Sequence, residues 1–128
     1  MRILFRVFGL TLLAGLMSGC TSAKAASNSQ VVVATGGNVA RGEQVIVQFK
    51  CGSCHTIPGI HNANGVFGPP LNQLARRSII AGEFPNEPDF LVQWVKSPTS
   101  MKPATAMPDL GLSEKQARDT AAYLETLR

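Results

Sequence analysis

The feature that most constrains the fold is a five-residue motif near the middle of the chain, Cys51-Gly52-Ser53-Cys54-His55. On a helical turn, residues i and i+3 share one face, so the two thiols are expected to point the same way. The residues between them are small and leave room for a flat group to approach that face. His55 follows at once and adds a nitrogen ligand beside the two sulfurs. The motif therefore predicts one site built from Cys51, Cys54 and His55.

This C-x-x-C-H spacing is the attachment motif of c-type haem. It predicts one covalently bound haem c, with Cys51 and Cys54 joined to the two vinyl groups and His55 as the proximal iron ligand. A haem would also complete the core of a small domain, because a chain with only 6% aromatic residues has little else to fill it.

Three other interpretations of the motif compete with haem attachment. A thioredoxin-type redox pair requires a βαβ setting, which the sequence does not indicate. A structural disulfide leaves His55 unexplained. A zinc site needs four closed ligands, and a set completed by His61 does not match the common finger spacings. Haem attachment is the interpretation that uses both thiols and the histidine.

The N-terminus has the order of a secretory signal: two arginines, an apolar stretch over residues 7–17, and then small residues. The segment Leu16-Met17-Ser18-Gly19-Cys20 resembles a bacterial lipobox, in which the chain is cut before the cysteine and the thiol is lipidated. We therefore expect a signal peptide at residues 1–19, lipidation of Cys20, and a location in the bacterial periplasm or on the outer face of the membrane. The alternative is a cut after Ala23-Lys24-Ala25, which would release a soluble protein.

The charge balance does not favour a nucleic-acid partner. Twelve Lys and Arg residues stand against eight Asp and Glu, and removal of Arg2 and Arg6 with the signal leaves ten against eight. Proteins that bind nucleic acid contact its phosphates with clustered Lys and Arg residues, and the sequence contains no such basic block. We expect no binding to nucleic acid.

The rest of the chain divides into a linker and a helical domain. Residues 20–37 are rich in Ser, Ala, Thr, Gly and Asn and are expected to form a flexible, lipid-anchored linker. The domain, residues 38–128, lacks strand alternation and is predicted to be all-α. Asn38, Asn86 and Ser113 are the expected helix N-caps, the last of them in a capping box. The helices are expected to cover residues 39–50, 71–80, 86–96 and 114–128.

Further motifs follow the haem motif in a fixed order: Gly68-Pro69-Pro70-Leu71, Trp94, Thr105, Met107 and Ala122-Tyr123-Leu124. With these motifs the chain resembles the class I monohaem cytochromes c over residues 38–128. The segments 51–60 and 105–112 are most similar to bacterial c domains that occur alone or fused to oxidase subunit II. The resemblance implies the cytochrome c fold, with three to five short helices around one covalently bound haem.

The resemblance also implies roles for individual residues. Met107 corresponds to the distal iron ligand. The Pro69 carbonyl corresponds to the acceptor that orients the His55 ring. Trp94 corresponds to an aromatic residue beside the haem, and Thr105 to a hydroxyl near a propionate.

Other residues carry expectations of their own. Gly42 is implied to let the first helix cross the last one closely, against Tyr123. Met101 is the alternative distal ligand, although no Pro-Asp-Leu-Gly pattern follows it. His61 would have to wrap around the haem edge to reach the iron and is expected in solvent. The Arg76-Arg77 pair is expected on a solvated face.

These features predict an electron carrier rather than an enzyme. With His55 and Met107 both bound, the iron has no open site for a substrate. The expected partners are an upstream redox donor and a downstream oxidase or other acceptor, in a respiratory chain at the membrane that holds the lipid anchor. The alternative is a haem enzyme or gas sensor, which would need an open sixth site on the iron.

Overall fold

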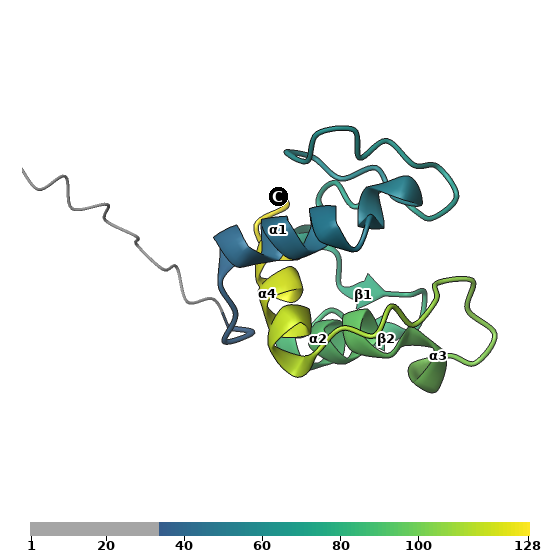
Figure 1. Cartoon of the computed structure of the whole chain (residues 1–128). Coiled ribbons are helices and arrows are strands. Elements are labelled where there is room, and N and C mark those ends of the chain that lie inside the picture. The colour runs from purple at the N-terminus through teal and green to yellow at the C-terminus, as the bar shows by residue number, and fades with distance from the viewer. Residues whose placement is uncertain (1–33) are drawn as a thin grey trace, which may run out of the picture.

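The computed structural model describes residues 34–128, which Figure 1 shows in colour. The predicted signal peptide (1–19), the predicted lipidation site Cys20 and most of the predicted linker lie outside the described residues. Within the described part of the chain, no helix combines the length and apolar character needed to cross a membrane. The elements in chain order are α1 (Val39–Gln48), η1 (Cys51–Ser53), η2 (Leu74–Arg76), β1 (Ile79–Ile80), β2 (Phe84–Pro85), α2 (Pro88–Lys96), α3 (Pro98–Met101) and α4 (Glu114–Leu124).

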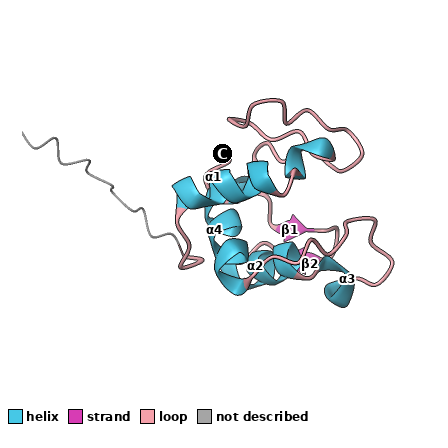
Figure 2. Cartoon of the chain, viewed as in Figure 1, coloured by secondary structure: helices cyan, strands magenta, loops and turns pink. Residues whose placement is uncertain are grey.

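The fold is predominantly helical, as predicted, but it includes a small two-stranded sheet (Figure 2). β1 and β2 are antiparallel, with Ile80 opposite Phe84. The turn between them places Ala81 and Gly82 at φ angles of 52° and 81°. This left-handed backbone is easy for glycine and unusual for alanine. Each strand has only two residues, so the alternation that would reveal it in the sequence cannot develop.

The predicted helix at residues 71–80 is wrong. Only η2 is helical there, and Gln73 before it has a left-handed backbone with φ of 56°. The Asn86 side-chain amide donates hydrogen bonds of 2.8 Å to the carbonyls of Leu74 and Arg77. Because the Asn86 side chain donates the hydrogen bonds that a longer helix would supply to those carbonyls, the turn ends early and the chain continues into β1.

Two of the three predicted helix caps are present. Asn38 caps α1, and Ser113 caps α4 in a capping box with Gln116. The third prediction, Asn86 as the cap of α2, is wrong, because Glu87 takes the cap position and Asn86 binds the carbonyls before β1. The helices α1 and α4 end two and four residues earlier than predicted.

The crossing of α1 over α4 forms the centre of the core (Figure 1). A Cβ atom on Gly42 would collide with the Asp119 carbonyl oxygen and lie 3.0 Å from the Cβ of Tyr123. Gly42 therefore permits the close crossing that the family resemblance implied. Ile46 on α1 and Ala121 on α4 are almost completely buried in the same interface.

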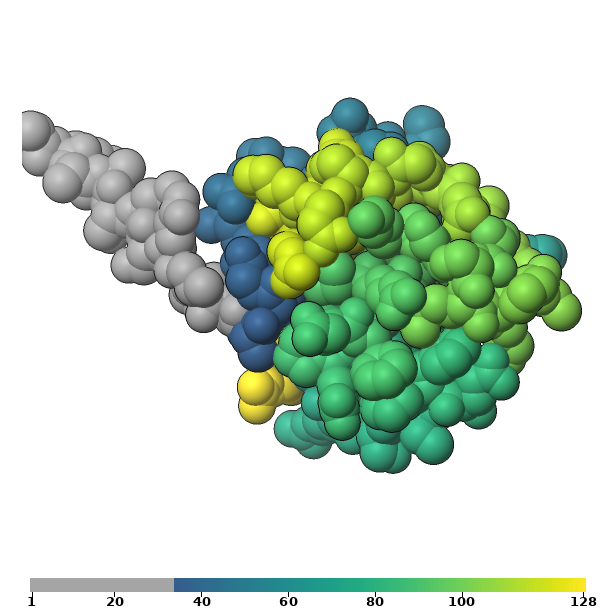
Figure 3. All heavy atoms as spheres, turned by 90° about the horizontal axis from the view of Figure 1, so that it is seen from below, coloured from purple at the N-terminus to yellow at the C-terminus, as the bar shows by residue number. Residues whose placement is uncertain are grey.

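The residues just before α1 pack against α4. Thr35 is 0% exposed, and its carbonyl accepts a 3.0 Å hydrogen bond from Arg118. The Asn38 N–H donates to the Asp119 carboxylate at 2.7 Å. Figure 3 shows this blue segment against the yellow-green atoms of α4. The folded unit thus takes in residues that the predicted linker 20–37 included.

The functional residues belong to two halves of the molecule. α1, η1 and the loop after His55 form one half, and α2, the sheet and α3 form the other (Figure 1). The segment from residue 97 to residue 111, called the strap below, runs along the second half. It is irregular as predicted, apart from the single turn of α3.

Candidate functional site

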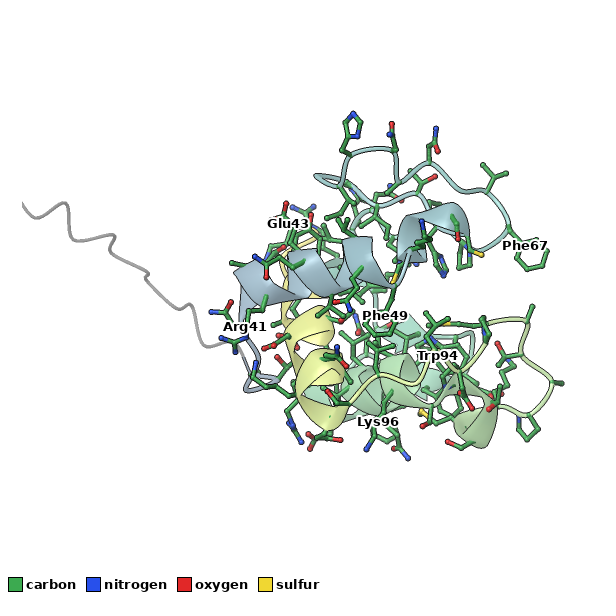
Figure 4. All side chains as sticks on the ribbon, in the orientation of Figure 1. Arg41, Glu43, Phe49, Phe67, Trp94 and Lys96 are labelled. Carbon is green, nitrogen blue, oxygen red and sulfur yellow. The ribbon has the colours of Figure 1, made fainter. Side chains whose placement is uncertain are left out.

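A cavity of about 530 Å³ lies where η1, the β1–β2 turn, α2 and the strap face one another. This volume is typical of a site for a small molecule or cofactor. In Figure 4, Phe49 and Trp94 extend into the region between the two halves. The lining includes all seven residues predicted for the site: Cys51, Cys54, His55, Pro69, Trp94, Thr105 and Met107.

The two cysteines lie on a tighter turn than the α-helical one assumed from their spacing. The N–H groups of Cys54 and His55 both donate to the Cys51 carbonyl oxygen, at 3.2 and 3.1 Å. Residues i and i+3 of such a turn are nearly eclipsed, so both side chains lie on one side of it. Both thiols are free, and burial raises the pKa of Cys51, with a smaller contribution from the neighbouring Cys54. No disulfide joins Cys51 and Cys54, and both residues line the cavity.

His55 is oriented by the backbone of the loop that follows it. Its Nδ1 atom lies 2.7 Å from the Pro69 carbonyl oxygen. A carbonyl oxygen only accepts, so Nδ1 carries the proton and Nε2 keeps a lone pair that can bind a metal. Gly68 allows this approach, because a Cβ atom there would lie 2.7 Å from Nδ1. The contact is the one that the family resemblance implied.

The strap brings Met107 to the cavity. The Met107 N–H donates to the Thr105 hydroxyl at 3.2 Å, so Thr105 supports the backbone that presents the thioether. Met101 does not line this cavity. His61 is exposed and lines a different, smaller pocket beside α1. Of the three candidate distal ligands, the structure thus places only Met107 in the cavity.

Trp94 packs within the second half and closes one side of the cavity. Its ring lies 5.9 Å from the ring of Phe84, at an angle of 39°. This tilted pairing fixes the indole between the sheet and the strap. The aromatic pair was invisible from the sequence because Phe84 belongs to the strand that was not predicted.

Three cations also line the cavity: Lys50, Arg77 and Lys102. Among the described residues, no Asp or Glu lines it. Arg77 is half-buried rather than on the predicted solvated face, and donates to the carbonyls of Pro70 (2.5 Å) and Asn72 (2.9 Å). No sequence periodicity connects Arg77 with the motif, so only the fold reveals its place.

The zinc interpretation lacks its ligands. Within residues 34–128, no three His, Cys, Asp or Glu side chains come together in a way that could hold a metal ion. His61, the fourth ligand required by that interpretation, lies outside the cavity that contains His55. A metal held through a larger cofactor needs fewer protein ligands and suits the arrangement better.

Comparison with known proteins agrees with the site. The family model for cytochrome c matches residues 39–128. The chain belongs to the cytochrome c family. Cytochromes c bind haem c covalently, and they are typically electron carriers rather than enzymes. The resemblance inferred from the order of the motifs is therefore confirmed.

A relative of this cytochrome is cytochrome c oxidase subunit 2 of Alkalihalophilus pseudofirmus. The two are 32% identical over 89 residues, which cover 69% of this chain and 25% of the relative. The chain thus spans about a quarter of the length of the protein that it matches. The shared part corresponds in length to the cytochrome domain.

The cavity of this cytochrome fits haem c. It has two free thiols on one turn, a histidine whose Nδ1 is already engaged, and a wall that is otherwise largely apolar. Glycine at position 68 leaves the space beside the imidazole that a side chain would fill. When bound, haem c supplies a one-electron iron couple. The family therefore transfers electrons, and the chain's own residues hold and orient the group that does so.

Proposed function

We propose that this cytochrome is an electron carrier in which Cys51 and Cys54 hold the haem and His55 and Met107 are its axial ligands. One observation carries the proposal: both sulfurs, the oriented imidazole and the Met107 thioether line a single cavity. His55 comes from the first half of the molecule and Met107 from the strap on the second half, so a flat group between them would be bound from both sides (Figure 1).

The two axial residues favour electron transfer over catalysis. The Pro69 carbonyl fixes the His55 ring, which keeps Nε2 available and its direction constant. Ligation by the Met107 thioether would raise the midpoint potential of the haem iron, because a thioether ligand favours the reduced metal. An enzyme or gas sensor would need an open sixth site on the iron, and the presence of Met107 in the cavity argues against that. Each side chain here orients or shields, and none is required to move a proton.

Replacement of Met107 tests the proposal. Met107→Ala should allow the reduced protein to bind carbon monoxide readily and should lower the midpoint potential, since the thioether no longer competes for the iron. Met101→Ala is the matched control and should change neither property. Both are measured by absorbance titration of the purified holoprotein. Ready CO binding by the wild type, or the reverse pattern in the two variants, would contradict Met107 as the distal ligand.

We also propose that the redox partners include an upstream donor and an oxidase as acceptor. The name of the relative supports the oxidase, because there a matching segment belongs to an oxidase subunit. Val66 and Phe67 provide a surface for contact, since they are 91% and 77% exposed and Phe67 lies at the cavity (Figure 4). This apolar pair at the edge of the redox site suits a transient complex in which apolar contact with the partner contributes more than charge pairing.

The membrane location rests on the sequence motif at Cys20. We propose that the mature chain begins at Cys20 and is held to the membrane by its lipid, through a linker that reaches the domain at the α1 and α4 side. Cys20→Ser should move the cytochrome to the soluble fraction or stall its processing, whereas a Met101→Ala control should remain with the membrane. Fractionation followed by a haem stain measures this. Wild-type protein found soluble, with an N-terminus at Ala26, would show that the alternative cut is used.

A further inference from the structure

The part of the strap that carries Met107 has little support from its own backbone. Among the described residues, none from 106 to 112 forms a backbone–backbone hydrogen bond. Gly111 is in the left-handed region at φ of 72°, and most of the segment is exposed. The position of the Met107 thioether must therefore be fixed by side-chain contacts.

One such contact closes the strap two residues beyond Met107. The Asp109 carboxylate accepts a 3.2 Å hydrogen bond from the Thr99 N–H and another from the Thr99 hydroxyl. Thr99 is itself firmly placed, because it follows Pro98, which is fully buried in the domain. The carboxylate thus joins a segment without backbone–backbone hydrogen bonds of its own to a fixed turn.

The opposite flank of the strap is attached separately. The Lys102 ammonium donates to the Ala81 carbonyl at 3.0 Å and lies 3.9 Å from Glu83. The Thr105 N–H then donates to the Lys102 carbonyl at 2.9 Å. This flank is held without Asp109, whereas between Met107 and the buried Leu112 the hydrogen bonds to the rest of the domain come from the Asp109 side chain.

We propose that Asp109 is a positioning residue for the distal ligand: through Thr99 it closes the strap and holds the Met107 thioether at the cavity. The inference rests on the proposed role of Met107. Asp109 does not line the cavity; it lowers the freedom of the chain that presents the ligand. Without it, Met107 should be displaced more easily by an external ligand, while the rest of the domain stays folded.

Imidazole titration of the oxidised holoprotein tests the proposal, because imidazole competes with a thioether for iron. The loss of two hydrogen bonds at an exposed carboxylate should raise the imidazole affinity of Asp109→Ala about threefold to tenfold. Thr99→Val, which removes only the hydroxyl, should give a smaller increase. Asp109→Asn should also be intermediate, because its amide oxygen still accepts from the Thr99 N–H.

Two further measurements separate positioning from general destabilisation. The absorption band that reports thioether bonding to iron(III) should weaken in Asp109→Ala, with little change in the midpoint of thermal unfolding. Asp89→Ala is the matched control, since Asp89 is an exposed aspartate in the first turn of α2. It should match the wild type in imidazole affinity and in the band.

The outcomes also distinguish this inference from the proposed function. Met107→Ala in the same titration should bind imidazole far more tightly than the wild type. If it binds like the wild type, Met107 is not the ligand and the proposed function fails. If Met107→Ala binds tightly but Asp109→Ala and Thr99→Val match the wild type, only the positioning role is overturned. An equal rise in Asp89→Ala would also overturn it.

Discussion

Replacement of Cys51 and Cys54 together with alanine is expected to abolish covalent haem and, with it, the folded domain. The reason is the cavity of about 530 Å³ at the centre of the site. Without haem, the mainly apolar side chains that line this cavity would face water, and a domain this small has little other core to compensate for them.

The control for the double variant is Cys20→Ser, which replaces the third cysteine of the chain and leaves the motif intact. A haem stain after denaturing electrophoresis should be present in Cys20→Ser and absent in the double variant, because only thioether bonds survive boiling in detergent. Circular dichroism should show that the double variant has lost most of its helical signal. A stained band from the double variant would contradict attachment at Cys51 and Cys54. A well-folded, haem-free double variant would instead show that the core closes without the cofactor.

The parts of the fold that the sequence predicted are those fixed by nearby residues. Asn38 and Ser113 cap their helices with side chains that bind within three residues, so their type and position are sufficient evidence. The turn that carries Cys51 and Cys54 is equally local. The mistaken helix at residues 71–80 shows the limit, because its early end depends on Asn86, which lies 12 residues beyond Leu74.

The same distinction applies to the site. The family resemblance led to the His55 and Pro69 pair because both residues belong to short motifs that can be read directly in the sequence. Arg77 lines the cavity, and Thr99 binds the strap, only through contacts made by the folded chain, to loop carbonyls and to Asp109 respectively. Neither contact has a period or a motif that a sequence could show. Residues that support a site through the backbone are therefore harder to predict than residues that bind the cofactor.

A buried carboxylate that no motif indicated leads to the second prediction. Asp119 on α4 is 2% exposed and accepts hydrogen bonds from Arg41 and Lys115 at 2.8 Å and from the Asn38 N–H at 2.7 Å. Burial alone would raise the pKa of Asp119, but these hydrogen bonds, that from Arg41 first, outweigh it and lower the pKa to about 2. Asp119 therefore joins the start of the domain to its last helix in the ionised form.

Asp119→Ala is expected to lower the free energy of unfolding at pH 7 by about 2–4 kcal/mol, because it leaves the buried Asn38 N–H and two cations without their acceptor. Asp119→Asn should lose about 2 kcal/mol, the amount that corresponds to a pKa lowered from 3.8 to about 2. Since the pKa is lowered by folding, this contribution is complete above pH 3.8 and is lost as the pH falls through about 2.

Denaturant unfolding of the holoprotein at several pH values between 7 and 2 measures both effects. The difference between wild type and Asp119→Asn should stay constant from pH 7 to about pH 5 and then shrink as Asp119 becomes protonated. Subtraction of the two curves cancels the titration of groups that do not interact with residue 119. Asp89→Asn, at an exposed aspartate in the first turn of α2, is the control and should lose no more than about 1 kcal/mol at pH 7. A difference that persists undiminished at pH 2 would mean that Asp119 stabilises the crossing of α1 and α4 by its shape rather than by its charge.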